Sequence, residues 1–207
     1  MTKMFAALVL VCSYSASADY SVWAAHPASV FLQDAVTKAE AVVAGKGDDA
    51  SKVAPLCAIM KNTASAGYIG GIWLGNYANL ASDQAGVKAF VALIPSIAMS
   101  KILPSLSNAG SAGIVISTTA TERNPTTWAV PARVTANGST YNVQIIVRMI
   151  NGKMRVIDGE YFGFSGVGYL KPDYQKKFDA AYQSNRLTPV SDVVKALSSA
   201  SGFVRCP

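Results

Sequence analysis

The amino-acid sequence predicts an α+β fold in which an antiparallel β-meander of about four strands is covered by N-terminal and C-terminal helices. Apolar residues recur at helical spacing in the first half of the chain and again after residue 173. Between these regions they alternate with polar residues, as in half-buried strands. Two Asn-Gly pairs, at 137–138 and 151–152, separate the alternating runs, and this dipeptide strongly favours a two-residue hairpin turn.

The N-terminus has the three parts of a secretory signal peptide. Lys3 gives a positive start, the apolar run 4–12 follows, and Ala16-Ser17-Ala18 supplies the small residues of a cleavage site. We therefore expect a signal peptide over residues 1–18 and a single domain over residues 19–207. An apolar first helix of a cytosolic fold is the alternative interpretation. After export, Cys57 and Cys206 could form a disulfide or remain as two buried thiols, and the sequence does not decide between these states.

The first half is predicted to hold three helical stretches. One carries apolar residues from Phe31 to Val43, and the loop Gly45–Ser51 follows it. The second runs from Val53 to about Leu80 and is expected to break at Gly70-Gly71. The third is expected to start near Ser82 and Asp83, to kink at Pro95 and to end at Pro104.

The predicted meander begins with a strand over Ile114–Thr121, and the turns then determine the register. Met149 is expected opposite Met154, Val147 opposite Val156 and Ile145 opposite Asp158. One sheet face should be apolar and covered by helices, with residues Trp128, Val130, Val134, Tyr141, Val143, Ile145, Val147, Met149, Met154 and Val156. The other face should be mostly solvated, with residues Arg133, Asn142, Gln144, Arg148 and Arg155.

Two helices are predicted after the sheet. Tyr174, Phe178 and Tyr182 are spaced four residues apart, which places them on one helical face. Thr188-Pro189 has the pattern of an N-cap followed by proline in the first helical position, and it opens the last predicted helix.

Composition and motifs point away from several functions. The formal net charge is +6, but the basic residues are scattered, so we predict no nucleic-acid partner. His26 is the only histidine and a capping or surface role is expected for it; no zinc-ligand spacing, phosphate-binding loop or nucleophile-elbow motif occurs. We therefore predict no cofactor, no metal site and no catalytic residue.

Asp158 and Glu160 give the best argument for an enzyme. Their predicted positions place both carboxylates on the apolar face at its mouth, where one of them could act as a general base on a small hydrophobic substrate. The alternative interpretations are that the strand bends near Gly159 and both residues face water, or that Asp158 caps backbone amides near Gly163.

Two segments resemble the MlaC-type (toluene-tolerance) family of periplasmic phospholipid-binding proteins. The stretch from Leu74-Gly75 to Gln84, with Phe90 six residues on, is similar to one family pattern. The strand Met154–Asp158, followed by Gly163-Phe164-Ser165, Lys171 and Tyr174, is similar to a second, although methionine and lysine replace its usual tryptophan and arginine. The resemblance covers roughly residues 69–197.

The resemblance implies an NTF2-like lipid-binding cone and a carrier located in the periplasm. It implies that phospholipid, or a similar amphiphile, is shuttled between the inner and outer membranes as part of an ABC-type system. The implied partners are an inner-membrane ABC/MCE transporter complex and an outer-membrane lipoprotein complex. A carrier of a polycyclic isoprenoid lipid is an alternative.

The acyl chains should then lie between the sheet and the helices, with the head group at the mouth near cations such as Lys171. An aromatic segment, Tyr161-Phe162-x-Phe164, is expected at the rim. The predicted lipid-binding residues are Tyr77, Phe90, Ile94, Ile97, Val130, Val143, Ile145, Val147, Met149, Val156, Tyr161 and Phe164.

Overall fold

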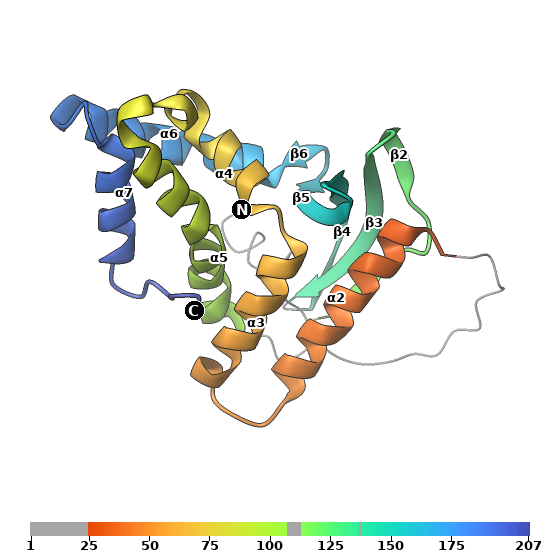
Figure 1. The fold of residues 1–207 in the computed structure, drawn as a ribbon. Helices are drawn as coiled ribbons and strands as arrows, with labels where there is room; N and C mark the ends of the chain where they lie inside the picture. Colours follow the sequence, from red (N-terminus) through yellow and green to blue (C-terminus); the bar gives the residue numbers. More distant parts are fainter. Residues whose placement is uncertain (1–24, 107–112, 137) are drawn as a thin grey trace.

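The computed structural model describes residues 25–106, 113–136 and 138–207 (Figure 1). The predicted signal peptide, most of the turn cluster after residue 107, and Asn137 lie outside the described residues. The helices are α2 (Pro27–Ala44), α3 (Asp49–Thr63), α4 (Ala66–Leu74), α5 (Gln84–Leu106), α6 (Gly166–Ser184) and α7 (Pro189–Ser198), with short 3-10 helices η1 (Gly75–Asn79) and η2 (Ala81–Asp83). The strands are β1 (Gly113–Ile116), β2 (Thr121–Asn124), β3 (Thr127–Ala136), β4 (Ser139–Ile150), β5 (Lys153–Tyr161) and β6 (Phe164–Ser165).

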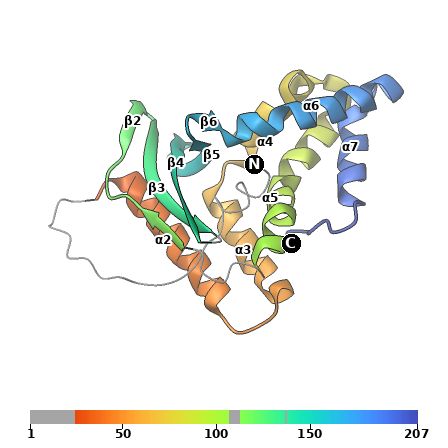
Figure 2. The ribbon, with the colours of Figure 1, turned by 180° about the vertical axis from the view of Figure 1, so that it is seen from behind.

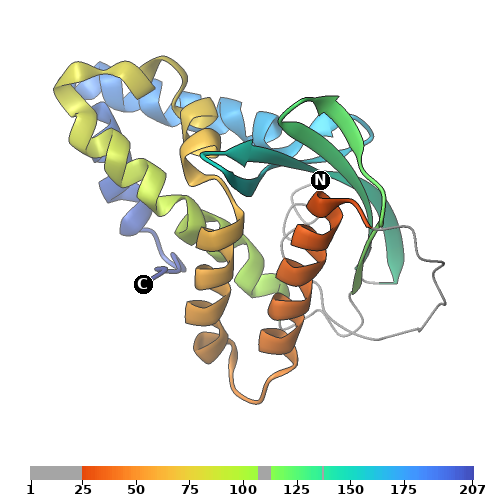
Figure 3. The same cartoon turned by 45° about the vertical axis from the view of Figure 1, so that its right-hand side comes forward.

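The six strands form one antiparallel sheet, which confirms the α+β prediction. The order is β1-β3-β4-β5-β6, and β2 pairs with another part of β3. Helix α2 packs along the inner face of the sheet, and the α2–α3 hairpin extends from it (Figures 1 and 3). Seen from behind, α6 leaves the β5–β6 end of the sheet and runs across α5 towards α7 (Figure 2). The molecule is therefore a sheet with helices on its inner side and a second helical group beside it.

Three of the predicted element boundaries are wrong. The expected strand 114–121 is two strands, β1 and β2. Gly70-Gly71 lies inside α4, and the break falls at Ala64–Ser65, where the Ser65 N–H donates to the Val156 carbonyl of β5. Helix α5 runs past Pro104 to Leu106, since the fixed φ of proline is itself compatible with a helix, and the kink expected at Pro95 stays a prediction. Length and composition alone would let the segment Ala81–Leu103, which comprises η2 and most of α5, cross a membrane, and core helices of soluble proteins pass the same test.

The inner face of the sheet is the apolar face that the sequence predicts. Val130, Val134 and Val147 are almost completely buried, and Ala28 and Leu32 of α2 pack against them. The outer face is less solvated than expected. Ala129, Ile146 and Ile157 are buried there, with Tyr68 of α4 packed against them.

The helical group has its own core, built from stacked aromatic rings. Trp73 of α4 stacks on Tyr174 of α6 with ring centroids 4.5 Å apart, and Phe90 of α5 meets Phe178 of α6 edge to face at 5.0 Å. The predicted four-residue spacing of Tyr174 and Phe178 therefore does place both rings on one buried face of α6.

The Asp83 side chain connects the start of α5 to the start of α7. Its carboxylate is only 2% exposed and accepts hydrogen bonds from the Gly86 N–H, at the start of α5, and from the Val190 and Ser191 N–H groups of α7. The Thr188 side chain makes no capping bond, so Asp83 takes that role from a distant part of the chain. This arrangement satisfies the unpaired amides at two helix starts with one side chain.

A disulfide joins Cys57 of α3 to Cys206 in the C-terminal tail, with the two Cα atoms 5.5 Å apart. The tail also contacts α5 along its length. The Ser100 hydroxyl accepts from the Val204 N–H at 2.8 Å, and the Ser96 hydroxyl accepts from the Cys206 N–H at 3.0 Å. The tail therefore holds α3 against α5.

Candidate functional site

A cavity of about 240 Å³ lies where the sheet, the α2–α3 hairpin and the helical group meet. Figure 3 shows α2 and α3 side by side in front of the sheet, with α5 crossing behind α3. The cavity is lined mostly by apolar side chains, namely Leu32, Ala35, Val36, Ala39, Leu56, Ile59, Met60, Ala64, Ile69, Trp73, Ile94, Ile97, Ala98, Ile102, Ile114, Ile145, Val156, Val167 and Leu170. Thr63, Lys101, Asp158, Gly159, Gly166 and Tyr174 complete the lining.

The polar side chains in the wall are largely engaged with the protein itself. The Thr63 hydroxyl donates to the Ile59 carbonyl at 2.8 Å, and the Trp73 indole N–H donates to the Val167 carbonyl at 2.9 Å. Burial, with a smaller contribution from the charge of Asp173, raises the pKa of Tyr174 to about 12. In the described part of the chain, no buried side-chain nitrogen or oxygen lacks a hydrogen-bond partner. An apolar molecule bound in the cavity would therefore gain surface contact with the wall and form few directional hydrogen bonds with it.

Lys101 is the exception to this pattern. Lys101 lies on the last part of α5, and its side chain is exposed. Among the described residues that line the cavity, it is the one with a positively charged side chain. No carboxylate of the described chain lies within salt-bridge distance of its ammonium group. Lys171, which was expected near the head group, is exposed on α6 and does not line the cavity.

Asp158 holds the start of α6. Its carboxylate accepts from the Val167 N–H at 3.0 Å and from the Gly159 N–H at 2.8 Å, and it also accepts from the Ser165 hydroxyl. Ser165 in turn caps α6 by accepting from the Gly168 N–H at 2.8 Å. A carboxylate at a helix N-terminus is stabilised by the free amides and the helix dipole. This is the capping role that the sequence offered as the alternative to catalysis, with the contact at Val167.

Asp158 and Glu160 do not form a pair at the mouth of the apolar face. A β-bulge at Ile157 shifts the register by one residue, so Ile146 and not Ile145 lies opposite Asp158, and Ile145 lies opposite Gly159. Glu160 lies opposite Gln144 on the outer face and forms a bidentate ion pair with Arg123, with both N–O distances 2.6 Å. This ion pair raises the pKa of Arg123 above its usual range. The expectation that both carboxylates share the apolar face is therefore wrong.

The cavity takes in four of the twelve residues predicted to contact lipid, Ile94, Ile97, Ile145 and Val156. The other eight lie elsewhere. Val130, Val143 and Val147 are in the packed core between α2 and the sheet, and Phe90 is in the helical core. Met149 is half-buried near the end of β4.

The remaining predicted residues are aromatic. Tyr77 packs beside Phe178 and donates to Asp179 at 2.7 Å; burial and this bond raise its pKa to about 12. Tyr161 packs edge to face with Tyr141 at 5.9 Å, beside the sheet core. Phe164 is 76% exposed at the β5–β6 turn. Their assignment as lipid contacts stays a prediction.

Sequence reasoning missed most of the helical side of the cavity. The residues from α2 were recognised as one apolar face, but the contribution of α3, through Leu56, Ile59 and Met60, was not. The only available signal was the apolar spacing of these residues on a predicted helix. That spacing does not distinguish a packed helix from one that borders a cavity.

His26 lies at the start of α2. The His26 Nδ1 accepts from the Ala28 N–H at 3.1 Å and so caps α2, which confirms the capping interpretation. Across the ranges that the structure describes, no cluster of three His, Cys, Asp or Glu residues could hold a metal ion.

Comparisons with known proteins show what this chain is similar to. A scan against protein-family models and a search of curated proteins found no match. Among solved structures, the chain is similar to a phospholipid-binding protein from Ralstonia solanacearum in complex with a phospholipid, with a TM-score of 0.65. The two chains share a fold. The sequence identity is 18%, and the match covers 83% of this chain and 94% of the other.

Proposed function

We propose that the protein is a lipid carrier that holds phospholipid acyl chains in the cavity between the sheet and the helices. The observation that carries this proposal is the apolar, internally hydrogen-bonded wall of that cavity. It is supported by the shared fold with a phospholipid-binding protein that is in complex with a phospholipid. No catalytic role is proposed, because both candidate carboxylates are engaged with the protein itself, Asp158 with the start of α6 and Glu160 with Arg123.

The energy of such binding comes from apolar area. Each methylene removed from water contributes about 0.8 kcal/mol, so ten of them contribute roughly 8 kcal/mol. This is close to the free energy that a dissociation constant of about 1 μM represents. An acyl chain can therefore be held without specific polar contacts, and an anionic head group would lie at the Lys101 end, where the exposed ammonium group can approach a phosphate.

We place this carrier in the periplasm, after removal of residues 1–18. There it would move lipid between the inner and outer membranes as the soluble component of an ABC-type (MCE) system, with an inner-membrane transporter complex and an outer-membrane lipoprotein complex as partners. The support is the sequence pattern of the N-terminus and the resemblance of residues 69–197 to the MlaC-type family.

The first test is mass spectrometry of an organic extract of the protein, purified from a periplasmic fraction without detergent. We expect phospholipid at about one molecule per chain. An extract containing a polycyclic isoprenoid would identify a different cargo for the same cavity. A protein that is empty, and remains empty after incubation with phospholipid vesicles, would contradict the carrier proposal.

A matched pair of variants localises the bound lipid. Ala98 lines the cavity, whereas Ala92, on the same helix, is exposed. Ala98→Phe should fill part of the cavity and abolish co-purification of lipid, while Ala92→Phe should retain it. Equal lipid content in the two variants would place the lipid outside this cavity.

A further inference from the structure

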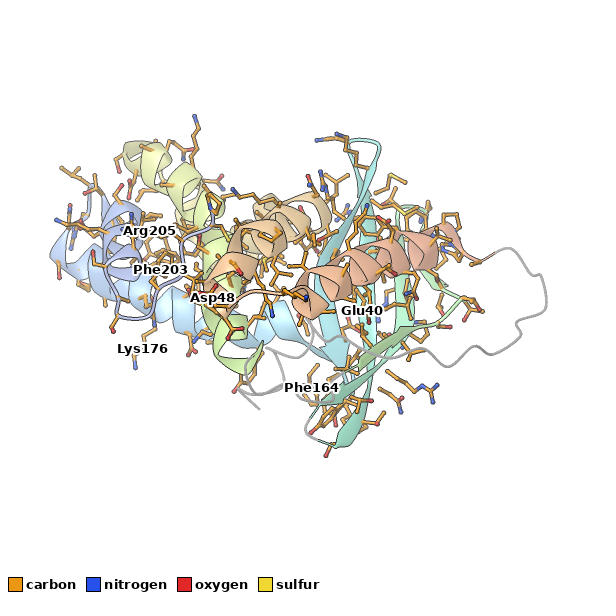
Figure 4. The ribbon with its side chains drawn as sticks, turned by 90° about the horizontal axis from the view of Figure 1, so that it is seen from below. Glu40, Asp48, Phe164, Lys176, Phe203 and Arg205 are labelled. Carbon is orange, nitrogen blue, oxygen red and sulfur yellow. A yellow bond between two sulfur atoms is a disulfide. The ribbon has the colours of Figure 1, made fainter. Side chains whose placement is uncertain are left out.

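The turn between β5 and β6 carries two phenylalanine side chains in solvent. Phe162 is 81% exposed and Phe164 is 76% exposed, the largest exposed fractions among the big apolar side chains that the structure describes. Tyr161 pairs with Phe164 across the ladder, so Phe162-Gly163 forms a two-residue turn at the tip. Phe164 lies at the margin of the molecule in Figure 4.

The backbone at this tip does not favour phenylalanine. Phe162 has φ 49° and Gly163 has φ 78°, the left-handed conformations that a type I′ turn needs at both central positions. Asn, Asp and Gly are preferred at the first of these positions, and a bulky residue there is strained. Phe162 gains little in return, because its ring touches Tyr161 but remains mostly in water. Neither the fold nor the turn type therefore explains an aromatic residue at position 162.

The turn is continuous with the wall of the cavity. Gly159, before the turn, and Gly166, after it, both line the cavity, so the exposed rings lie only a few residues from the proposed lipid site. At the base of the turn, Arg123 and Glu160 neutralise each other. Lys171 lies exposed on α6, beyond Gly166. No carboxylate of the described chain lies within salt-bridge distance of it.

From these observations we propose that the β5–β6 turn is a membrane-contact element. Phe162 and Phe164 insert into the head-group region of an anionic lipid bilayer when lipid enters or leaves the cavity. This inference rests on the proposed carrier function, because only a cargo exchanged with a membrane gives the tip a reason to lie beside the cavity.

The size and charge of the patch favour a bilayer over a protein partner. Two phenylalanine side chains bury roughly 300–500 Å² together, below the ~800 Å² that each partner buries in a standard specific protein interface. A shallow membrane contact needs only a few apolar side chains with electrostatic attraction to anionic lipids. The net charge of +6, which becomes +5 when residues 1–18 and Lys3 with them are removed, supplies that attraction. Aromatic side chains, chiefly those of tryptophan and tyrosine, are also enriched at membrane–water interfaces.

The insertion test uses Phe164→Trp as a fluorescent reporter, read as the difference from the parent protein. Vesicles contain phosphatidylglycerol and phosphatidylcholine, with bromine on the acyl chains near the head group. We expect quenching and a blue shift with these vesicles, and weaker effects with phosphatidylcholine alone. Leu187→Trp is the matched control, because Leu187 is 69% exposed in the α6–α7 connection, and it should not be quenched. Absence of quenching of the Phe164→Trp reporter would overturn the proposal.

The functional test compares lipid transfer between vesicles by the parent, by Phe162→Asn/Phe164→Ser and by Leu187→Ser. Transfer should fall about tenfold in the double variant and stay unchanged in the control, since membrane affinity scales with buried apolar area. Lipid content measured by extraction should be the same in all three. Unchanged transfer by the double variant would overturn the proposal, as would a loss seen only when a membrane-protein partner is present.

Stability separates this role from a structural one. Phe162→Asn should leave the midpoint of thermal unfolding equal or higher, because asparagine tolerates φ 49° better than phenylalanine. A lower midpoint would show that Phe162 serves the fold, which contradicts the proposal. If the parent protein is empty of lipid but its Phe164→Trp form is still quenched, the carrier function fails while the membrane contact stands.

Discussion

Cys57 in α3 and Cys206 in the C-terminal tail are joined by a disulfide across 149 residues of chain. Cys57 adjoins Leu56, whose side chain lines the cavity, so the bond fixes one wall of the cavity to the end of the protein. Together with the Ser96 and Ser100 hydroxyls of α5, it holds α3 in place from the outside.

Removal of this disulfide should destabilise the protein. A bond that closes a long loop restricts the unfolded chain, and its loss typically costs about 2–5 kcal/mol. We expect Cys57→Ser/Cys206→Ser to lower the free energy of unfolding in urea by that amount. Reductant should give the parent a similar loss and the variant none. A double variant as stable as the oxidised parent would contradict this expectation.

Substitutions of Asp158 and Glu160 should lower the stability of the protein by different amounts. Neither substitution should change the amount of bound lipid. Asp158→Asn loses charge-assisted bonds at the start of α6, which should lower the free energy of unfolding by about 1–3 kcal/mol. Glu160→Gln loses a partly exposed ion pair with Arg123 and should cost about 1 kcal/mol or less. Urea unfolding measures both. A large loss of bound lipid in either folded variant would reopen a role for these carboxylates in the site.

Gly86 and Gly71 give a matched pair of glycine-to-alanine substitutions in helices. A Cβ atom at Gly86 would lie 2.4 Å from Asp83 Oδ1 and 2.6 Å from the Ser191 nitrogen, whereas a Cβ at Gly71 meets nothing within 4 Å. Gly86→Ala should therefore destabilise by about 1–3 kcal/mol through overpacking. Gly71→Ala should stabilise by about 0.5–1 kcal/mol, the usual helix preference. Thermal unfolding of both variants checks the opposite signs, and a stabilised Gly86→Ala would contradict the close approach of α5 and α7.

Tyr174 should make the protein less stable at alkaline pH. Its pKa is raised to about 12 in the folded protein by burial, against an ordinary value of 10.0. Because the folded pKa is the higher one, its stabilisation is fully present below pH 10 and is lost as the pH rises towards 12. Tyr174→Phe should remove this loss, which amounts to roughly 2–3 kcal/mol.

The measurement for Tyr174 is urea unfolding of the parent and of Tyr174→Phe between pH 7 and 11.5. The difference in unfolding free energy between the two proteins should be constant up to about pH 9 and then change in favour of the variant. A difference that stays constant over the whole range would show that the phenol titrates normally in the folded state.

The strand register was predictable wherever an Asn-Gly turn determined it. The pairs of β3 with β4, from Val134–Tyr141 to Trp128–Val147, are those derived from the sequence, and so are Met149–Met154 and Val147–Val156. The bulge at Ile157 was not predictable, because its position accompanies contacts between Asp158 and the start of α6, which is a tertiary feature. A single extra residue was enough to move Glu160 to the other face.

The candidate site was predictable only in part, for a different physical reason. Apolar spacing identified faces of α2, α5 and the sheet, and Ile94, Ile97, Ile145 and Val156 do meet in the cavity. Val130 and Val147 have the same pattern and are completely packed. Whether an apolar side chain meets another side chain or an empty space depends on how far helices and sheet stand apart, and one sequence carries no direct signal of that distance.

Thr63, Trp73 and Asp158 line the cavity but form their hydrogen bonds with other parts of the protein. This affects how different lipids would compete for the cavity. A molecule inside meets no unpaired donor or acceptor from these groups, so they fix neither the depth of its tail nor its rotation about its long axis. Homologous tails would therefore rank by their oil–water partition coefficients, with each added methylene improving occupancy by about fourfold until the cavity is full. The protein would therefore select lipids by the length of their tails. From a mixed membrane it would take lipids according to their tail composition.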